Sequence, residues 1–238
     1  LHGDFLFDNN FANEVAPHDF EVNLEVVGNG TWTAGSTQYL DFSGVLSGSG
    51  TITAQANAAG AGELHSRWRG ANTFDGTLII DNVFLSIDDP NAFQYADVVI
   101  NHNNGFRIYG FSNQTIHVAS LSGTGLLDFL GNDFVTTSDA DTTFSGTLKS
   151  TSGSSAIRNF TKTGAGTLTL SGQVTSFGAL INTGNGGLNV DGGGDIQILE
   201  VRSGEVNVRG QALDLGSEAA NTFFMHNDGT ARVRTARW

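Results

Sequence analysis

The chain has no cysteine and only 2 prolines, 2 lysines and 1 methionine in 238 residues. The lack of cysteine excludes a disulfide framework and thiolate chemistry. The scarcity of proline, without a Gly-X-Y period, excludes collagen. Only 15 % of the residues are charged. This argues against intrinsic disorder, because disordered chains combine dense charge with low hydrophobicity. No apolar run approaches the roughly 18 residues of a membrane span, so direct membrane insertion is not expected.

Apolar residues make up 39 % of the chain and include 17 Phe, which is enough to build a core. The chain also contains 32 Gly, 24 Thr and 21 Asn, and glycine is nearly twice as frequent as in average proteins. Because these three residue types are poor helix formers, we expect an all-β protein. Its only expected helix is a short one near residues 212–220.

The charge is strongly acidic and unevenly distributed along the chain. Acidic residues outnumber basic ones by 24 to 11, which gives a net charge of −13. Phosphate binding needs basic residues, so a nucleic acid partner and an anionic membrane surface are both disfavoured. No Lys or Arg precedes Arg67, whereas Arg232, Arg234 and Arg237 lie in the last seven residues. The two ends are either ordinary solvated surface or complementary ends that direct a head-to-tail association.

Short runs of alternating apolar and polar residues recur after residue 20, for example at Thr77–Ile80, Thr115–Val118 and Glu205–Val208. This period of two is typical of strands with one buried face. Clusters of Gly, Asn, Asp and Ser separate the runs and supply turns. From Leu148 onward the strands recur roughly every 8–12 residues, as in a sandwich, barrel or solenoid. No linker divides the chain, so we expect residues 1–238 to form a single elongated β domain.

Two repeated patterns favour a stacked architecture. They are Phe-[Ser/Asp]-Gly-x-Leu, which begins at Phe42, Phe74 and Phe144, and Gly-x-Gly-x-[Leu/Ile], which begins at Gly48, Gly60, Gly123 and Gly164. Each copy joins a tight glycine turn to a strand whose apolar residues point inward. Units that cannot bury their apolar face alone normally stack on their neighbours, and a coil of about 20–25 residues fits this chain. The irregular spacing of the copies indicates that loops absorb insertions.

One segment resembles the autotransporter-associated β-strand repeat of bacterial passenger domains: Phe160-Thr161-Lys162-Thr163-Gly164-Ala165-Gly166-Thr167-Leu168-Thr169-Leu170-Ser171-Gly172. Residues 70–78 are similar to the part that usually follows this repeat, and residues 42–52 and 144–148 to the part that usually precedes it. The resemblance implies a right-handed parallel β-helix that is exported to the cell surface or released. The alternative fold that the strand spacing allows is a β-sandwich or jelly roll completed by strand donation between subunits.

A solenoid has an open strand edge at each end, which needs a cap or a partner. Residues 1–20 are acidic and rich in Phe, so we expect either an N-terminal cap or an arm that adds a strand to a neighbouring subunit. Near the C-terminus, arginines alternate as on an exposed edge strand, where they can also prevent aggregation. The residues predicted to mediate self-assembly are Leu1, Phe5, Phe7, Phe11, Arg232, Arg234, Arg237 and Trp238.

Cleavage of a glycosidic bond would need two carboxylates across a sugar-binding groove. The candidate carboxylates are Asp88, Asp89, Asp128, Asp133, Asp139 and Asp141. Asp88-Asp89-Pro90-Asn91 favours a turn, and the simpler interpretation of Asp139 and Asp141 is a solvated loop. We therefore expect no catalytic residue and no enzymatic activity, and a polysaccharide lyase or hydrolase remains the alternative.

Residues 186–191 partly match the Gly-Gly-x-Gly-x-Asp nonapeptide of calcium-binding β-rolls, with Asn189 in place of the fourth-position glycine. No second copy follows in register, so the favoured interpretation is a glycine turn closed by Asp191 and Asp195, the two calcium candidates. The six His lack the spacing of zinc ligands. We expect no cofactor other than this calcium candidate.

The most distinctive polar and aromatic patch is His65-Ser66-Arg67-Trp68-Arg69. In a strand, alternation places His65, Arg67 and Arg69 on one face and Trp68 on the other. The patch is either a solvated strand with a buried Trp or a contact for a glycan or a second subunit, because Trp and Arg are enriched at binding hot spots.

These observations favour a secreted bacterial protein that is extracellular or displayed at the cell surface. Its expected role is that of a structural subunit that associates with itself head to tail into fibres. The alternative is a monomeric, adhesin-like passenger that binds glycans or other surface components.

Overall fold

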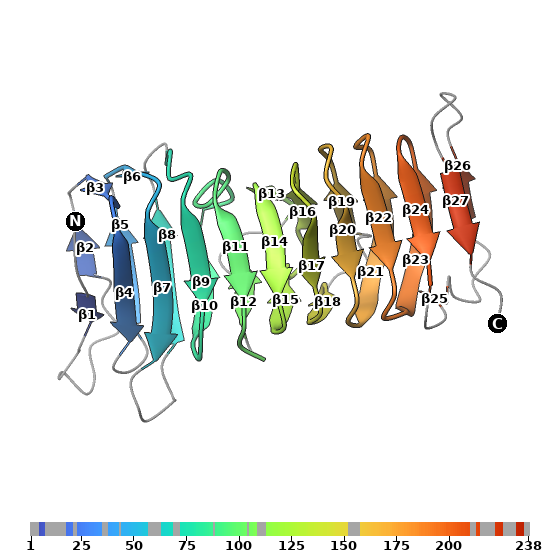
Figure 1. The fold of residues 1–238 in the computed structure, drawn as a ribbon. Helices are drawn as coiled ribbons and strands as arrows, with labels where there is room; N and C mark the ends of the chain where they lie inside the picture. The colour runs from blue at the N-terminus through green and yellow to red at the C-terminus, as the bar shows by residue number, and fades with distance from the viewer. Residues whose placement is uncertain are drawn as a thin grey trace.

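The protein is a right-handed parallel β-solenoid, seen in Figure 1 as an elongated stack of strands that starts at β1 and β2 and ends at β26 and β27. This computed structural model describes residues 5–7, 18–20, 23–34, 38–42, 44–56, 63–68, 72–87, 89–103, 105–108, 113–151, 158–209, 213–214, 222–225 and 232–235. Within these ranges the chain is all-β, and every strand pairs in parallel with its neighbours. The expected fold is confirmed, and the alternative sandwich is wrong because its antiparallel pairs do not occur among the described strands.

One face of the solenoid is a sheet that we call sheet A. Each coil adds one strand to it, so its strands follow one another in chain order. They are β1 (Phe5–Phe7), β4 (Asn29–Ala34), β7 (Thr51–Ala56), β9 (Thr77–Ile80), β11 (Asp97–Ile100), β14 (Ser120–Gly123), β17 (Thr142–Phe144), β20 (Leu168–Leu170), β22 (Gly187–Val190), β24 (Glu205–Val208) and β27 (Arg232–Thr235).

The opposite face is a second parallel sheet, sheet B. Its strands are β2 (His18–Phe20), β5 (Gln38–Phe42), β8 (Glu63–Trp68), β10 (Phe84–Ile87), β12 (Phe106–Ile108), β13 (Thr115–Val118), β15 (Leu126–Asp128), β16 (Asp133–Thr136), β18 (Thr147–Lys149), β19 (Asn159–Lys162), β21 (Val174–Asn182), β23 (Gly194–Val201), β25 (Leu213–Asp214) and β26 (Thr222–Met225). A small third sheet pairs β3 (Leu24–Glu25) with β6 (Leu46–Ser47).

Coil length varies along the solenoid while the strands stay in register. The register partners Leu188 and Val206 are 18 residues apart, whereas Phe5 and Trp32 are 27 residues apart. Strand length is limited by the pairing between coils, so the extra residues enter the loops. The irregular spacing of the sequence repeats has this physical cause.

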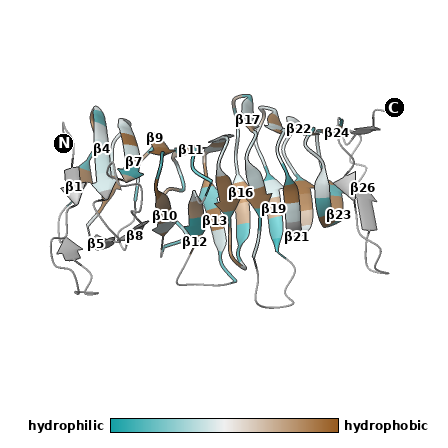
Figure 2. Ribbon diagram, turned by 90° about the horizontal axis from the view of Figure 1, so that it is seen from below, coloured by the Kyte–Doolittle hydropathy of each residue, from teal (hydrophilic) through white to brown (hydrophobic). Residues whose placement is uncertain are grey.

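Inward-facing side chains form continuous columns between the sheets, because strand alternation and register repeat in each coil. One column in sheet A joins Ile52, Leu78, Val98 and Leu121, which are all fully buried. In sheet B the rings of Phe134 and Phe160 stack with their centroids 5.7 Å apart. Figure 2 shows hydrophobic and hydrophilic stretches mixed along the strands of sheet B from β10 to β23. The alternation seen in the sequence therefore corresponds to an apolar interior and polar outer faces.

The two glycines of a Gly-x-Gly turn are required for different reasons. In the copy that starts at Gly164, this first glycine has φ +80°, a conformation that disfavours other residues. The second, Gly166, lies so close to the preceding coil that an added Cβ would be 2.3 Å from the carbonyl oxygen of Ala140. The described copies at Gly48 and Gly123 also begin with a positive φ. The repeated pattern therefore marks where one coil turns directly on another.

The short helix expected near residues 212–220 is not found in the described part of this segment. Leu213–Asp214 form β25, which pairs in parallel with Gly194 and Asp195 of β23. The remaining residues of the segment lie outside the described ranges. Pairing with the preceding coil here outweighs the local helix preference, as tertiary context often does.

We predict that Gly166→Ala strongly destabilises the solenoid. The new methyl group would overlap backbone atoms of the preceding coil, so the loss should exceed about 2 kcal/mol. The control is Gly187→Ala, whose Cβ would first meet the Thr167 side chain at 3.1 Å. Urea unfolding followed by circular dichroism measures both variants, and equal midpoints would contradict close backbone stacking as the reason for the glycine.

Candidate functional site

Sheet B divides into two branches in the middle of the solenoid. Strands β12, β15 and β18 pair in one branch, and strands β13, β16 and β19 pair in the other. The branches join at β21, whose first half pairs with β18 and whose second half pairs with β19. A loop therefore interrupts sheet B in successive coils, and backbone groups at the interruption need partners other than the sheet.

Polar side chains gather at this interruption and form what we call the polar corner. Its members are Asn113, Asp128, Asn132, Ser150, Thr151 and Arg158, which come from three successive coils. Asp128 and Asn132 are 2 % and 0 % exposed. Ser150 and Arg158 are also buried, whereas Asn113 and Thr151 are exposed, so the polar corner brings four buried polar side chains together.

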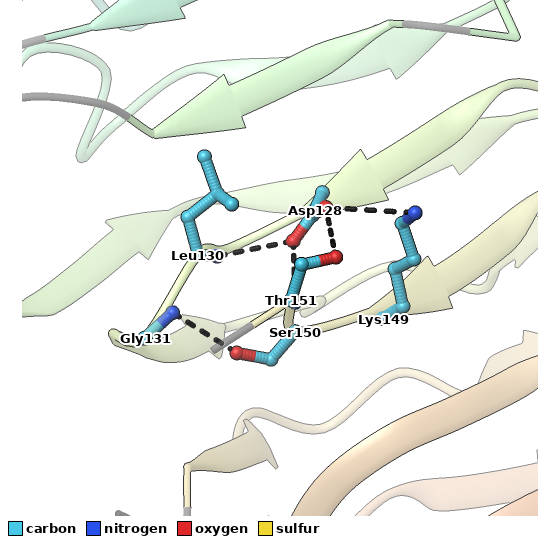
Figure 3. Close-up of polar contacts among 6 residues, drawn as sticks. All are labelled: Asp128, Leu130, Gly131, Lys149, Ser150 and Thr151. Atoms are coloured by element: carbon cyan, nitrogen blue, oxygen red, sulfur yellow. Dashed lines mark hydrogen bonds and ion pairs between the residues drawn. The ribbon is translucent and has the colours of Figure 1, made fainter. Parts of the chain in front are cut away.

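Asp128 is the centre of the polar corner (Figure 3). Its Oδ1 accepts hydrogen bonds from the backbone N–H groups of Leu130 at 3.2 Å and Thr151 at 2.8 Å. Its Oδ2 accepts one from the Thr151 hydroxyl at 2.7 Å and lies 3.7 Å from Nζ of Lys149. A buried carboxylate is tolerated when hydrogen bonds and an opposite charge replace water, and all of these are present here.

The loop beside Asp128 is held by a second set of side chains. Asn132 donates from Nδ2 to the carbonyl oxygens of Phe129 at 3.1 Å and Leu130 at 3.3 Å. Its Oδ1 accepts from the backbone N–H of Gln114 at 3.2 Å, which belongs to the preceding coil. Arg158 donates from the following coil to Oδ1 of Asn113. The corner thus links coils through side chains where the sheet cannot.

The chemistry of the polar corner follows from these partners. Both oxygens of Asp128 are occupied, and the strands beside it place Arg107 and Lys149 at the register positions on either side. Each oxygen of Asp128 already accepts at least one hydrogen bond within the protein, and these bonds hold the loop and the next coil in place. The geometry supports a structural role for the corner.

The other candidate carboxylates that the structure describes also bind backbone N–H groups. Asp133, Asp139 and Asp141 each accept an N–H from the residue 26 positions further on, in the next coil. The donors are Asn159 at 2.8 Å, Ala165 at 3.1 Å and Thr167 at 2.7 Å. Asp89 accepts the N–H of Asn91 at 2.7 Å, so the predicted turn is confirmed there. Asp88 lies outside the described residues. None of these contacts assembles a pair of carboxylates across a groove.

The predicted calcium ligands have other surroundings in the structure. Oδ1 of Asp191 lies 3.1 Å from Nε of Arg209, at the register position one coil further on, and Asp195 is exposed. Within the described ranges, no group of three or more His, Asp or Glu side chains could hold a metal ion. The calcium site stays a prediction. The Arg209 guanidinium already pairs with Asp191, one of its two candidate carboxylates.

None of the predicted contact residues has a described side chain. The backbones of Phe5, Phe7, Arg232 and Arg234 lie in β1 and β27, at the two ends of sheet A, while Leu1, Phe11, Arg237 and Trp238 lie outside the described residues. The backbones of His65, Arg67 and Trp68 lie in β8, and Arg69 lies outside the described residues. In β8 the register places His65 opposite Tyr39 and Ser86.

The residues that sequence reasoning missed are the buried polar ones. Lys162 and Asn182 are both 0 % exposed, and Asn72, at 2 %, accepts the backbone N–H of Leu46 at 2.8 Å. Burial lowers the pKa of Lys162, and the charges of Asp139 and Asp141 partly oppose this effect. Strand parity could have flagged Lys162, because it lies two residues after the inward-facing Phe160.

Comparison with protein-family models, with curated proteins and with solved structures gives no match to this chain. The resemblance to autotransporter-associated repeats therefore stays a prediction. The described residues also include no helix of the length and apolar character that a membrane span requires.

We predict that Asp128→Ala destabilises the protein by about 1–3 kcal/mol, because it leaves buried N–H groups of the polar corner without an acceptor. Asp128→Asn keeps one acceptor oxygen and should lose less. The control is Asp75→Ala at an exposed carboxylate. Urea unfolding measures the three variants, and equal stability of Asp128→Ala and Asp75→Ala would show that the corner does not hold the coils.

Proposed function

We propose that the chain is a structural subunit of an extracellular or cell-surface assembly in which copies stack head to tail. The observation that carries the proposal is the form of sheet A, which is parallel throughout and runs from the edge strand β1 to the edge strand β27. A parallel sheet can be extended by a translated copy without turning it over. An open edge with a row of unpaired N–H and C=O groups is a template for another strand.

Charge supports the same direction of stacking. No Lys or Arg precedes Arg67, so the end of the solenoid that includes β1 is acidic. At the opposite end, β27 carries Arg232 and Arg234, with Arg232 in register with Glu205 of β24. Opposite charges on the two ends of a rod accelerate and orient association. Two like ends would repel each other, which favours head-to-tail over head-to-head contact.

The contacts of the described carboxylates support a scaffold more than a catalyst. The buried carboxylate Asp128 and the loop residues Asp133, Asp139 and Asp141 all accept backbone hydrogen bonds, most of them from the next coil. Secretion and surface display are part of the proposal because of the resemblance to bacterial passenger repeats. A rod that stays monomeric and binds glycans is the competing function.

We predict that Arg232→Glu with Arg234→Glu abolishes assembly, because both ends of the rod then carry the same charge. The matched control is Arg202→Glu with Arg209→Glu, which changes the net charge equally on exposed arginines before the last coil. Electron microscopy and sedimentation of the purified chain give the readout. Fibres from both double variants would contradict charge-directed stacking, and monomers of the unchanged chain at all concentrations would favour the glycan-binding rod.

We also predict that deletion of residues 1–11 abolishes assembly, because it removes β1, the strand to which a neighbouring copy would add. If these residues instead form a cap, the deletion exposes β4 and should increase association. Sedimentation of the deletion variant separates the two results.

Raising the salt concentration from about 0.1 M to about 1 M should weaken assembly of the unchanged chain, since it shortens the screening length from about 10 to 3 Å.

A further inference from the structure

The buried side chains of Lys162 and Asn182 are neighbours in successive coils. Lys162 ends β19 and Asn182 ends β21, and the two residues are register partners in the parallel pairing of these strands. Both are 0 % exposed. Neighbouring strands lie about 4.8 Å apart, so two inward-facing side chains at one register position occupy the same part of the interior.

The polar ends of the two side chains reach the same corner of the solenoid. Nζ of Lys162 donates to the carbonyl oxygen of Gly164 at 2.9 Å. The loop of the next coil lies directly on this group, because a Cβ on Gly184 would be 2.2 Å from the same Gly164 oxygen. Asn182 donates from Nδ2 into that loop, to the carbonyl oxygen of Gly186 at 3.1 Å.

The carboxamide of Asn182 is bound on one side only. Its Nδ2 also contacts the carbonyl oxygens of Ser203 at 3.0 Å and Glu205 at 3.4 Å, both from the following coil. Its Oδ1 is buried and has no hydrogen-bond partner. A buried acceptor without a partner is unusual in a folded protein and calls for an explanation.

Lys162 is a buried amine rather than a solvated surface cation. Burial is the main influence on its pKa and lowers it, so more of the amine is neutral at a given pH than in water, while Asp139 and Asp141 act in the opposite direction. A desolvated neutral lysine amine is the form that attacks carbonyl carbon. The only other lysine, Lys149, is partly exposed and lies beside the Asp128 carboxylate.

We propose that Lys162 and Asn182 form an intramolecular isopeptide bond. Nζ of Lys162 attacks Cγ of Asn182 and forms the new C–N bond, and the bond from Cγ to Nδ2 breaks. One proton passes from Nζ to Nδ2, so the leaving group is neutral ammonia and no oxidant, reductant or cofactor is needed. The three carbonyl oxygens around Nδ2 hold the leaving nitrogen, and the product joins two coils covalently.

The bond is a site of self-modification that does not depend on assembly. It would link strands β19 and β21 where the two branches of sheet B meet. A covalent link between coils at this point resists their separation when a fibre or a surface rod is pulled along its axis.

The test is the intact mass of the purified protein with its sequence unchanged, measured under denaturing conditions. A bond between Lys162 and Asn182 lowers the intact mass by one ammonia, about 17 Da. It also blocks trypsin after Lys162, so residues 159–202 should appear as one peptide with the same mass deficit. A full sequence mass together with cleavage after Lys162 would overturn the proposal.

Two variants locate the bond. Lys162→Arg keeps the positive charge but has no lysine amine, and Asn182→Ala removes the carboxamide, so each should restore the full sequence mass. The control Lys149→Arg should keep the deficit. Ring closure at Asn185-Gly186 would lose the same mass, but that deficit would persist in Lys162→Arg and would contradict the assignment to Lys162. Fibre formation is measured separately, so this result and the proposed function can fail independently.

Discussion

The close contact between the backbones of successive coils is the constraint on which the rest of this structure depends. Each strand pairs in parallel with the equivalent strand of the next coil, and the turns between them come so close that several positions have no room for a Cβ. At Gly166 and Gly184 the neighbouring atom is a carbonyl oxygen of the coil before. Glycine at these positions keeps the coils in register, and register in turn aligns the inward-facing side chains into columns.

Where the sheets are interrupted, polar side chains provide the hydrogen bonds that hold successive coils together. Asp128, Asp133, Asp139 and Asp141 accept backbone N–H groups, and Asn132 does so while also donating to its own loop. Outer-face amides also bridge coils, since Asn207 donates to Asn189 at 2.9 Å and Asn189 donates to Thr169 at 3.1 Å. A chain rich in Asn, Thr and Gly can therefore be stable with few charges. Many of the described polar side chains bond along the axis, to a neighbouring coil.

Several parts of this architecture could be predicted from the sequence and several could not. The alternation at Thr77–Ile80 and the paired glycines at Gly164 and Gly166 report local geometry, and both predictions agree with the structure. The roles of Asp128 and Asn132 depend on loops about one coil away, whose lengths vary, so no local pattern contains them. Lys162 shows the conflict most clearly: parity places it inside, whereas its residue type suggests the surface.

The sequence by itself determined that the chain is all-β, because strand periodicity and the glycine requirement of tight turns are local properties of the chain. The choice of a parallel solenoid over a sandwich needed the tertiary structure. Only the tertiary structure decided which polar groups meet. Register brings Lys162 to Asn182 across 20 residues, and it gives the Asp128 carboxylate its partners at Thr151. These pairings depend on the number of residues in each loop and on burial between coils. Burial also changes the chemistry of a side chain, as it does for the Lys162 amine, and no stretch of residues carries that information alone.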